Sequence, residues 1–163
     1  AHRLNEIVVE ALAGLDAATR GSIQVIHLTG VKDYEWVFGK YHALGIACSV
    51  HSFIDRVEEA YSASDIIVTR SGASAIFEAA FFARPMVLVP YPYAMNHQLE
   101  NARAFAAKGA AVILEEKALT PEIFRKTVTS LLGDASRCRA MADAAKRSSV
   151  PDASERLAAV VAG

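Results

Sequence analysis

Hydrophobic residues along the chain follow two alternating spacings, and these predict helices and strands in turn. Leu4, Ile7, Val8 and Ala11 lie at helical spacing, which predicts a helix over residues 3–17. The short apolar run IQVIHL is rich in β-branched residues and is followed by Thr-Gly, so it predicts a buried strand. The chain therefore opens as a helix followed by a strand.

The same alternation continues through most of the sequence. The runs IACSVHSF, DIIVT, PMVLVPY and AAVILEE predict further strands, and the segments between them predict helices. Three more helices are expected after the last strand. Helix starts are indicated by Asp55 as an N-cap, by Thr120 before Pro121, and by a capping box of Asp152 with Glu155.

Strands that alternate with helices predict a parallel sheet with helices on both faces, an α/β Rossmann-like fold. Gly45 and Gly109 are expected to end two of the helices. A length of 163 residues, 53% of them hydrophobic, fits one such domain. Ligands of these sheets bind beyond the carboxyl ends of the strands, so the loops there are expected to carry the function.

Composition and charge exclude several classes of partner. With 17 basic and 18 acidic residues and no basic run, the chain is not expected to bind nucleic acid. Glu78, Arg84 and Pro85 interrupt the most apolar stretch, so no membrane-spanning helix is expected. No signal-peptide pattern is evident, which makes the cytoplasm the default location. Neither the two cysteines nor the histidines show metal-ligand spacing, so no metal and no cofactor are expected.

The segment TRSGAS joins a predicted strand to a predicted helix and has two interpretations. Ser71 is expected to cap the helix, and Gly72 removes a side chain where a ligand could approach the backbone. Free N–H groups and the positive end of the helix favour a phosphate there. An ordinary cap and turn fits the same residues.

Glu78 is the one charged residue between Ser71 and Ala83, and burial of an unpaired carboxylate is costly. A separation of seven residues from Ser71 is close to two helical turns, about 10 Å along the axis. A phosphate at the helix start and a carboxylate at this distance are spaced like the ends of a nucleoside phosphate. The carboxylate would then accept hydrogen bonds from both ribose hydroxyls. A solvent-facing glutamate or an internal salt bridge is the alternative.

Polar residues gather in the segment NHQLENA, at the start of a later predicted helix. Asn96, His97, Gln98 and Asn101 supply neutral donors and acceptors, which suit sugar hydroxyls but also suit a plain polar helix start. His97 could alternatively act as a general base or a cap. In the loop SFID, the backbone beside Ile54 could contact a base edge, or the loop could simply be an apolar strand end.

The order of these motifs resembles the MurG family of bacterial N-acetylglucosaminyltransferases. HLTG, FID, DIIVTRSGASAIFE, RPMVLVPYP, NHQLENA and GAAVIL follow the order of the C-terminal half of that family, and the resemblance covers nearly the whole chain. It implies that residues 1–163 form the UDP-sugar-binding C-terminal domain of a two-domain GT-B glycosyltransferase. The implied reaction transfers N-acetylglucosamine from UDP-N-acetylglucosamine to lipid I, with inversion, to form lipid II in peptidoglycan synthesis. The whole enzyme would lie at the cytoplasmic face of the inner membrane as a peripheral protein.

The resemblance also implies which residues bind the nucleotide. The main chain of Ile54 would contact uracil, and Glu78 would hold the ribose hydroxyls. Ser71, Gly72 and Ala73 would lie at the diphosphate and donor end.

A second group of residues would face the sugar or the cleft. His97 and Gln98 would face the donor sugar, with Asn101 close by, and Asn5 would lie near the cleft. Many family members have two glutamines where this chain has His97 and Gln98. The family's general base and acceptor site belong to its N-terminal domain, so the catalytic base is expected outside these residues, with His97 as a reserve candidate.

The opening AHRLNE resembles the segment directly after the family's glycine-rich GGSQG loop. The strand before that loop is central in the family's sheet, so these residues are expected to be a fragment that lacks the middle of its sheet. Two other hypotheses stay open. One is a non-catalytic UDP-N-acetylglucosamine-binding subunit with a separate membrane partner, and the other is a related UDP-sugar epimerase or glycolipid synthase.

Overall fold

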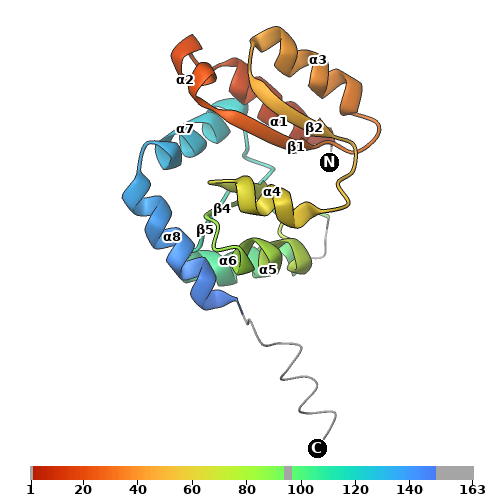
Figure 1. Cartoon of the computed structure of the whole chain (residues 1–163). Coiled ribbons are helices and arrows are strands. Elements are labelled where there is room, and N and C mark those ends of the chain that lie inside the picture. Colours follow the sequence, from red (N-terminus) through yellow and green to blue (C-terminus); the bar gives the residue numbers. More distant parts are fainter. Residues whose placement is uncertain (1, 94–96, 150–163) are drawn as a thin grey trace, which may run out of the picture. The chain divides into compact units, whose positions relative to one another are not determined.

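The computed structural model describes residues 2–93 and 97–149, in which helices alternate with parallel strands (Figure 1). Internal contacts divide the described chain into two compact units. The first contains residues 2–64 and 114–134, and the second contains residues 65–113 and 135–149. The helix expected after Pro151, with its capping box of Asp152 and Glu155, lies outside the described residues.

The first unit consists of helices and strands from the first part of the chain, together with one helix from later in the chain. Its elements are α1 (His2–Ala13), α2 (Ala17–Ser22), β1 (Gln24–Leu28), α3 (Tyr34–Leu44), β2 (Ala47–His51), α4 (Val57–Ala63) and α7 (Pro121–Leu132).

The second unit has shorter strands and closes with the last described helix. Its elements are β3 (Ile67–Thr69), α5 (Ala73–Phe81), β4 (Met86–Leu88), α6 (His97–Ala107), β5 (Ala111–Ile113) and α8 (Ala135–Ser148).

All strand pairs are parallel, which confirms the predicted class of sheet. β1 pairs with β2, and β4 lies between β3 and β5. Among the described residues the strands thus form a two-stranded and a three-stranded sheet rather than one continuous sheet.

Burial differs sharply between the two sheets. Met86, Val87 and Leu88 of β4 are fully buried, and a strand lies on each side of β4. In β1, by contrast, Ile26 and Leu28 are 38% and 43% exposed, and only alternate residues such as Val25 pack against the core of the unit. The prediction that β1 is a buried strand is therefore wrong: among the described residues, one face of β1 is left uncovered.

Two of the predicted helix boundaries need correction. The helix predicted over residues 3–17 ends at Ala13, because Asp16 caps a separate short helix by accepting a 2.9 Å hydrogen bond from the N–H of Thr19. Asp55 is not the cap of α4: Arg56 occupies that position, and no side chain caps the helix.

Both predicted glycine stops are confirmed. Gly45 and Gly109 end α3 and the α6 segment with φ of +65° and +77°, a conformation that costs glycine little. In each case the next N–H reaches back to a carbonyl in the last turn: Ile46 to Tyr41 at 3.1 Å and Ala110 to Phe105 at 3.0 Å.

The predicted start of α7 is also confirmed and gives a stability test. The hydroxyl of Thr120 accepts a 3.2 Å hydrogen bond from the N–H of Ile123, and Pro121 takes the first helical position. We expect Thr120→Ala to lower the free energy of unfolding by about 1 kcal/mol, measured by urea denaturation. Thr120→Ser keeps the acceptor and is the control. An alanine variant as stable as the serine variant would contradict the role of this cap.

Candidate functional site

The loop between β3 and α5 brings Ser71 and Gly72 to the start of a helix, as the sequence predicts, but with different roles. Gly72 occupies the N-cap position, and no side chain caps α5. Ser71 is fully buried, and its hydroxyl has no hydrogen-bond partner among the described residues. The prediction that Ser71 caps the helix is therefore wrong, because its side chain turns into the interior one residue before the cap.

The start of α5 has no side-chain cap among the described residues. In any helix the first N–H groups have no partner within the helix, so these donors are available to a ligand. Ala73 is exposed, and a Cβ added at Gly72 would meet no atom within 4 Å. The space outside this helix end is open, and the partial positive charge there favours an anion.

Glu78 lies on the exposed side of α5 rather than in an apolar interior. The two phenylalanines nearest to it on the helix, Phe77 and Phe81, are themselves 50% and 60% exposed. Because α5 begins at Ala73, the carboxylate is about 7.5 Å along the axis from the helix start, not about 10 Å. It shares a face with Ser74, one turn nearer to that start, and both residues are exposed.

The start of α6 holds the loops that follow β3 and β4. Asn101 donates a 3.2 Å hydrogen bond from Nδ2 to the carbonyl of Ser71. Gln98 accepts a 2.9 Å hydrogen bond through Oε1 from the N–H of Tyr91. His97 is exposed, and Asn96 lies outside the described residues. The structure thus brings Gln98 and Asn101 to the start of α5. The side-chain oxygen of Gln98 and the side-chain nitrogen of Asn101 already make hydrogen bonds that position loops.

An aromatic pair at the end of β4 is a feature that sequence reasoning missed. The guanidinium of Arg70 lies over the ring of Tyr91, 5.4 Å from its centroid, and Arg70 also donates a 3.3 Å hydrogen bond to the carbonyl of Val89. Tyr91 and Tyr93 make an edge-to-face contact with ring centroids 5.5 Å apart. The signal was the segment VPYPY, directly after a buried strand.

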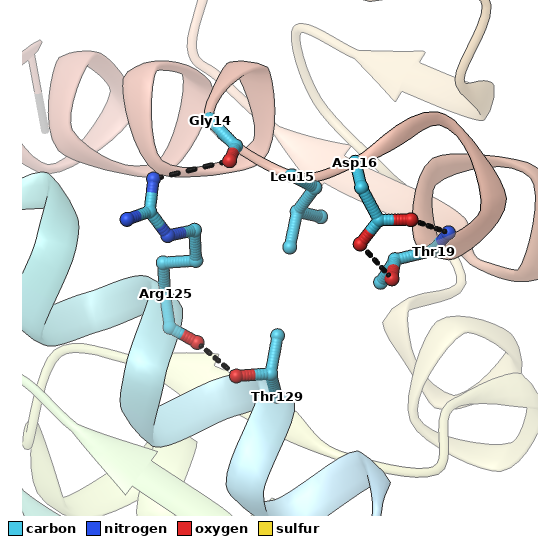
Figure 2. Close-up of a pocket in the computed structure, with 6 residues that line it drawn as sticks. All are labelled: Gly14, Leu15, Asp16, Thr19, Arg125 and Thr129. Carbon is cyan, nitrogen blue, oxygen red and sulfur yellow. Dashed lines mark hydrogen bonds between the residues drawn. The ribbon is translucent and has the colours of Figure 1, made fainter.

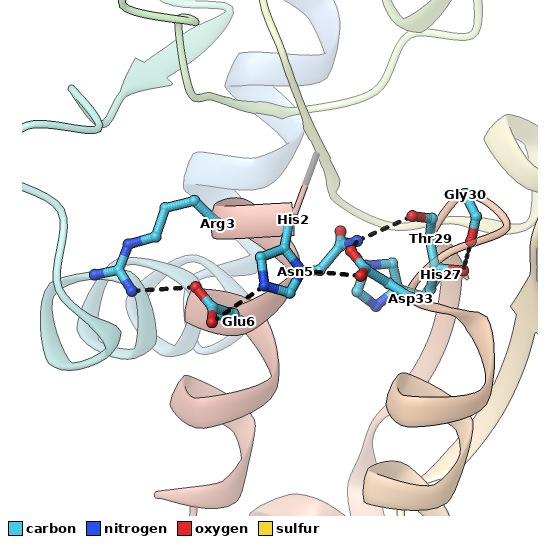
Figure 3. A network of polar contacts seen from close by, with 8 residues as sticks. All are labelled: His2, Arg3, Asn5, Glu6, His27, Thr29, Gly30 and Asp33. Atoms are coloured by element: carbon cyan, nitrogen blue, oxygen red, sulfur yellow. Dashed lines mark hydrogen bonds and ion pairs between the residues drawn. The ribbon is translucent and has the colours of Figure 1, made fainter.

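Ile54 and Asn5 belong to the first unit. Ile54 is partly buried in the loop after β2, beside Phe53, which is 74% exposed. Asn5 is only 4% exposed. It donates from Nδ2 to the carbonyl of Thr29 at 3.0 Å and to a carboxylate oxygen of Asp33 at 2.7 Å (Figure 3). Asn5 therefore fixes the loop after β1 from within the unit.

His27 completes this polar network, and sequence reasoning gave it no role. Its Nε2 lies 3.1 Å from Oδ1 of Asn5, and its Nδ1 lies 2.8 Å from the hydroxyl of Tyr41. Because the oxygen of Asn5 can only accept, Nε2 carries the proton and the hydroxyl of Tyr41 donates to Nδ1. Burial lowers the pKa of His27 to about 4, although the negative charge of Asp33 partly opposes this.

Asp33 is the last member of this network and connects it to His2. Its carboxylate accepts from Nδ1 of His2 at 2.8 Å, and this hydrogen bond, more than the one from Asn5, holds the pKa of Asp33 below its usual value. Burial also raises the pKa of Tyr41, so that its hydroxyl stays protonated.

An open pocket of about 420 Å³ lies between the end of α1, the start of α2 and α7 (Figure 2). Arg125 donates a 3.1 Å hydrogen bond to the carbonyl of Gly14 at one side of it, and Asp16 and Thr19 pair with each other at the other. None of the predicted site residues lines this pocket.

Two negative findings apply to residues 2–93 and 97–149. No group of three or more His, Cys, Asp or Glu side chains in this part of the chain could hold a metal ion. No helix within it is long and apolar enough to cross a bilayer.

The alternating helices and parallel strands, with polar loops at the strand ends, define a class of protein: the Rossmann-like C-terminal domain of a GT-B glycosyltransferase. The model of the glycosyltransferase family 28 C-terminal domain matches residues 1–157, and the chain belongs to this family.

Named relatives agree with this assignment. The chain is 41% identical over 161 residues to the UDP-N-acetylglucosamine–N-acetylmuramyl-(pentapeptide) pyrophosphoryl-undecaprenol N-acetylglucosamine transferase of Anaeromyxobacter sp. (strain K), with 98% of this chain and 42% of the relative covered. It is 35% identical to the protein of the same name from Geobacter metallireducens, with 90% and 40% covered. The chain thus spans less than half the length of these curated relatives.

Solved structures show the same fold. The crystal structure of Acinetobacter baumannii MurG is 29% identical and matches with a TM-score of 0.87, over 98% of this chain and 46% of that one. The spinosyn forosaminyltransferase SpnP matches at a TM-score of 0.68 and 20% identity, over 98% of this chain and 38% of that one, a likeness of fold alone.

The polar network around His27 predicts a pH-dependent stability. Between pH 6.5 and about 4 the unfolded chain takes up a proton at His27 that the folded chain does not, so the free energy of unfolding falls as the pH falls. The loss from this group is about 3 kcal/mol between pH 7 and pH 4. Urea denaturation across this range measures it, and His27→Gln should remove that part of the pH dependence.

The matched control is His42→Gln, on the exposed side of α3. The effect of Asp33 is separate, because a carboxyl with a lowered pKa loses its stabilising contribution only as the pH falls below about 3.8. Equal pH dependence in the two histidine variants would contradict the role of His27.

Proposed function

We propose that residues 1–163 are the donor-binding C-terminal domain of an enzyme that transfers N-acetylglucosamine from UDP-N-acetylglucosamine to lipid I, with inversion, to form lipid II. The observation that carries this proposal is the uncapped, open start of α5, with the Glu78 carboxylate exposed farther along the same helix. The names of the relatives, which describe this transfer, support it.

The diphosphate of the donor is assigned to the start of α5. Backbone N–H groups at Gly72 and Ala73 would donate to its oxygens, and the positive helix end would favour its charge. The hydroxyl of Ser71 has no hydrogen-bond partner among residues 2–93 and 97–149. A small rotation of this side chain on binding would give it a phosphate oxygen as acceptor.

The ribose is assigned to Glu78. Ser74 lies one turn before it on the same exposed face, and its short side chain leaves room for a nucleoside along the helix. A carboxylate about 7.5 Å from the helix start suits the hydroxyls of a ribose whose phosphate lies at that start. For Ile54, in the first unit, the proposed role is main-chain contact with uracil, as the family resemblance implies.

The donor sugar is assigned to the start of α6. His97 is exposed there, and Gln98 uses its oxygen on Tyr91, which leaves its amide nitrogen to donate. Asn101 and Asn5 act indirectly in this proposal: Asn101 holds the loop of Ser71, and Asn5 holds the loop after β1.

In the transfer step the bond between the sugar and the diphosphate breaks, and negative charge grows on UDP. The start of α5 would stabilise this charge with backbone donors that are already in place. The base that activates the acceptor is expected in the rest of the enzyme, with His97 in reserve. Since the relatives' acceptor carries undecaprenol, we propose that the whole enzyme lies peripherally on the cytoplasmic membrane face.

The full-length protein allows a direct test. Incubated with UDP-N-acetylglucosamine and lipid I, it should release UDP and form lipid II. An epimerised UDP-sugar as product would instead support a related epimerase. Binding of the donor without turnover, restored by a separate membrane protein, would support a non-catalytic subunit.

Substitution of the ribose ligand is the sharpest binding test. In the full-length protein, Glu78→Ala should weaken UDP-N-acetylglucosamine binding about ten-fold or more, because hydrogen bonds to a charged group are lost. Calorimetric titration measures this, with Glu10→Ala at an exposed position of α1 as the control. Unchanged affinity in Glu78→Ala would rule out the assignment of the ribose.

Ser71→Ala should raise the stability of the protein and lower its affinity for UDP. Removal of a buried hydroxyl without a partner is expected to raise the free energy of unfolding of the unliganded protein by about 1 kcal/mol. The same change should weaken binding of UDP, because a donor to the diphosphate is lost. Parallel urea denaturation and titration with UDP test both effects, and a less stable variant that binds UDP normally would contradict this role.

A further inference from the structure

Two loops at the strand ends of the second unit are held together by one face of α6. Gln98 and Asn101 are three residues apart, so their side chains leave the helix on the same side. Gln98 fixes the backbone of Tyr91, and Asn101 fixes that of Ser71. The segment that carries Tyr91 is therefore placed beside the start of α5.

Arg70, in the loop after β3, also holds the segment that follows β4. It precedes Ser71 in the chain, yet its guanidinium lies over the ring of Tyr91 and donates to the carbonyl of Val89. A backbone hydrogen bond and a cation–π contact thus fix Tyr91. Tyr93 makes its ring contact with this fixed neighbour and is 81% exposed.

The proposed position of the nucleoside sets a direction for the donor sugar. If the diphosphate lies at the start of α5 and the ribose lies at Glu78, the nucleoside runs along the helix. The sugar, on the other side of the diphosphate, then extends past the helix start, toward the loop that Arg70 and Gln98 fix. The rings of Tyr91 and Tyr93 lie on that loop.

We propose that Tyr93 packs its ring against the pyranose of the donor sugar and so contributes to selection of the sugar, with Tyr91 as its positioning residue. This inference rests on the function proposed above. A pyranose presents C–H groups on one face, and an exposed aromatic ring can cover that face while the hydroxyls keep their hydrogen bonds. Such contact buries apolar surface of both partners and is lost when the ring is removed.

The test compares two ligands that differ only in the sugar. UDP and UDP-N-acetylglucosamine are titrated calorimetrically into the full-length protein and its variants. Tyr93→Ala should weaken binding of UDP-N-acetylglucosamine about ten-fold and leave binding of UDP unchanged. Tyr93→Phe, which keeps the ring, should bind both ligands like the wild type. Phe38→Ala removes an exposed ring on α3 and is the matched control.

The outcomes separate this inference from the function on which it rests. A wild-type protein that does not bind UDP-N-acetylglucosamine overturns the proposed function and this inference with it. A wild type that binds it, with equal affinity in Tyr93→Ala, overturns the role of Tyr93 alone. Equal losses for UDP and UDP-N-acetylglucosamine also overturn it, because the ring would then act on the nucleotide or on the loop.

Discussion

A helix start without a side-chain cap is the constraint on which the candidate site depends. The first N–H groups of α5 have no side-chain acceptor, since Ser71 is turned inward and Gly72 has no side chain to offer. Most helices satisfy such groups with a serine, threonine or aspartate, as Thr120 does for α7. An unsatisfied helix end lowers stability when the site is empty, and an arriving anion offsets that loss. In the proposed function, the same end would stabilise the charge of a departing diphosphate.

Much of the fold follows from local patterns in the sequence. Parallel strands, the glycine stops at Gly45 and Gly109, and the Thr120 cap were all predicted, because each depends on residues close together in the chain. The burial of β1 was predicted wrongly for the opposite reason. An apolar run shows that a strand forms, but whether both faces are covered depends on which neighbours it acquires.

The candidate site was predicted in part for the same reason. Sequence spacing located the loop before α5 and the polar start of α6, yet it could not show which groups bond to each other. Ser71 looked like a cap and is a buried hydroxyl, and Glu78, for which a ligand role, a solvent-facing position and an internal salt bridge were all considered, is exposed. The network of Asn5, His27 and Asp33 joins residues 22 to 28 positions apart and has no local signature.

The bonds from Gln98 and Asn101 change how substitutions at the start of α6 should be interpreted. Each side chain holds a neighbouring loop, so its removal increases the freedom of the empty site as well as deleting a polar group. A ligand that binds to such a loosened site loses affinity to the entropy of ordering it. Lower affinity in a Gln98 variant therefore measures lost preorganisation together with any lost contact.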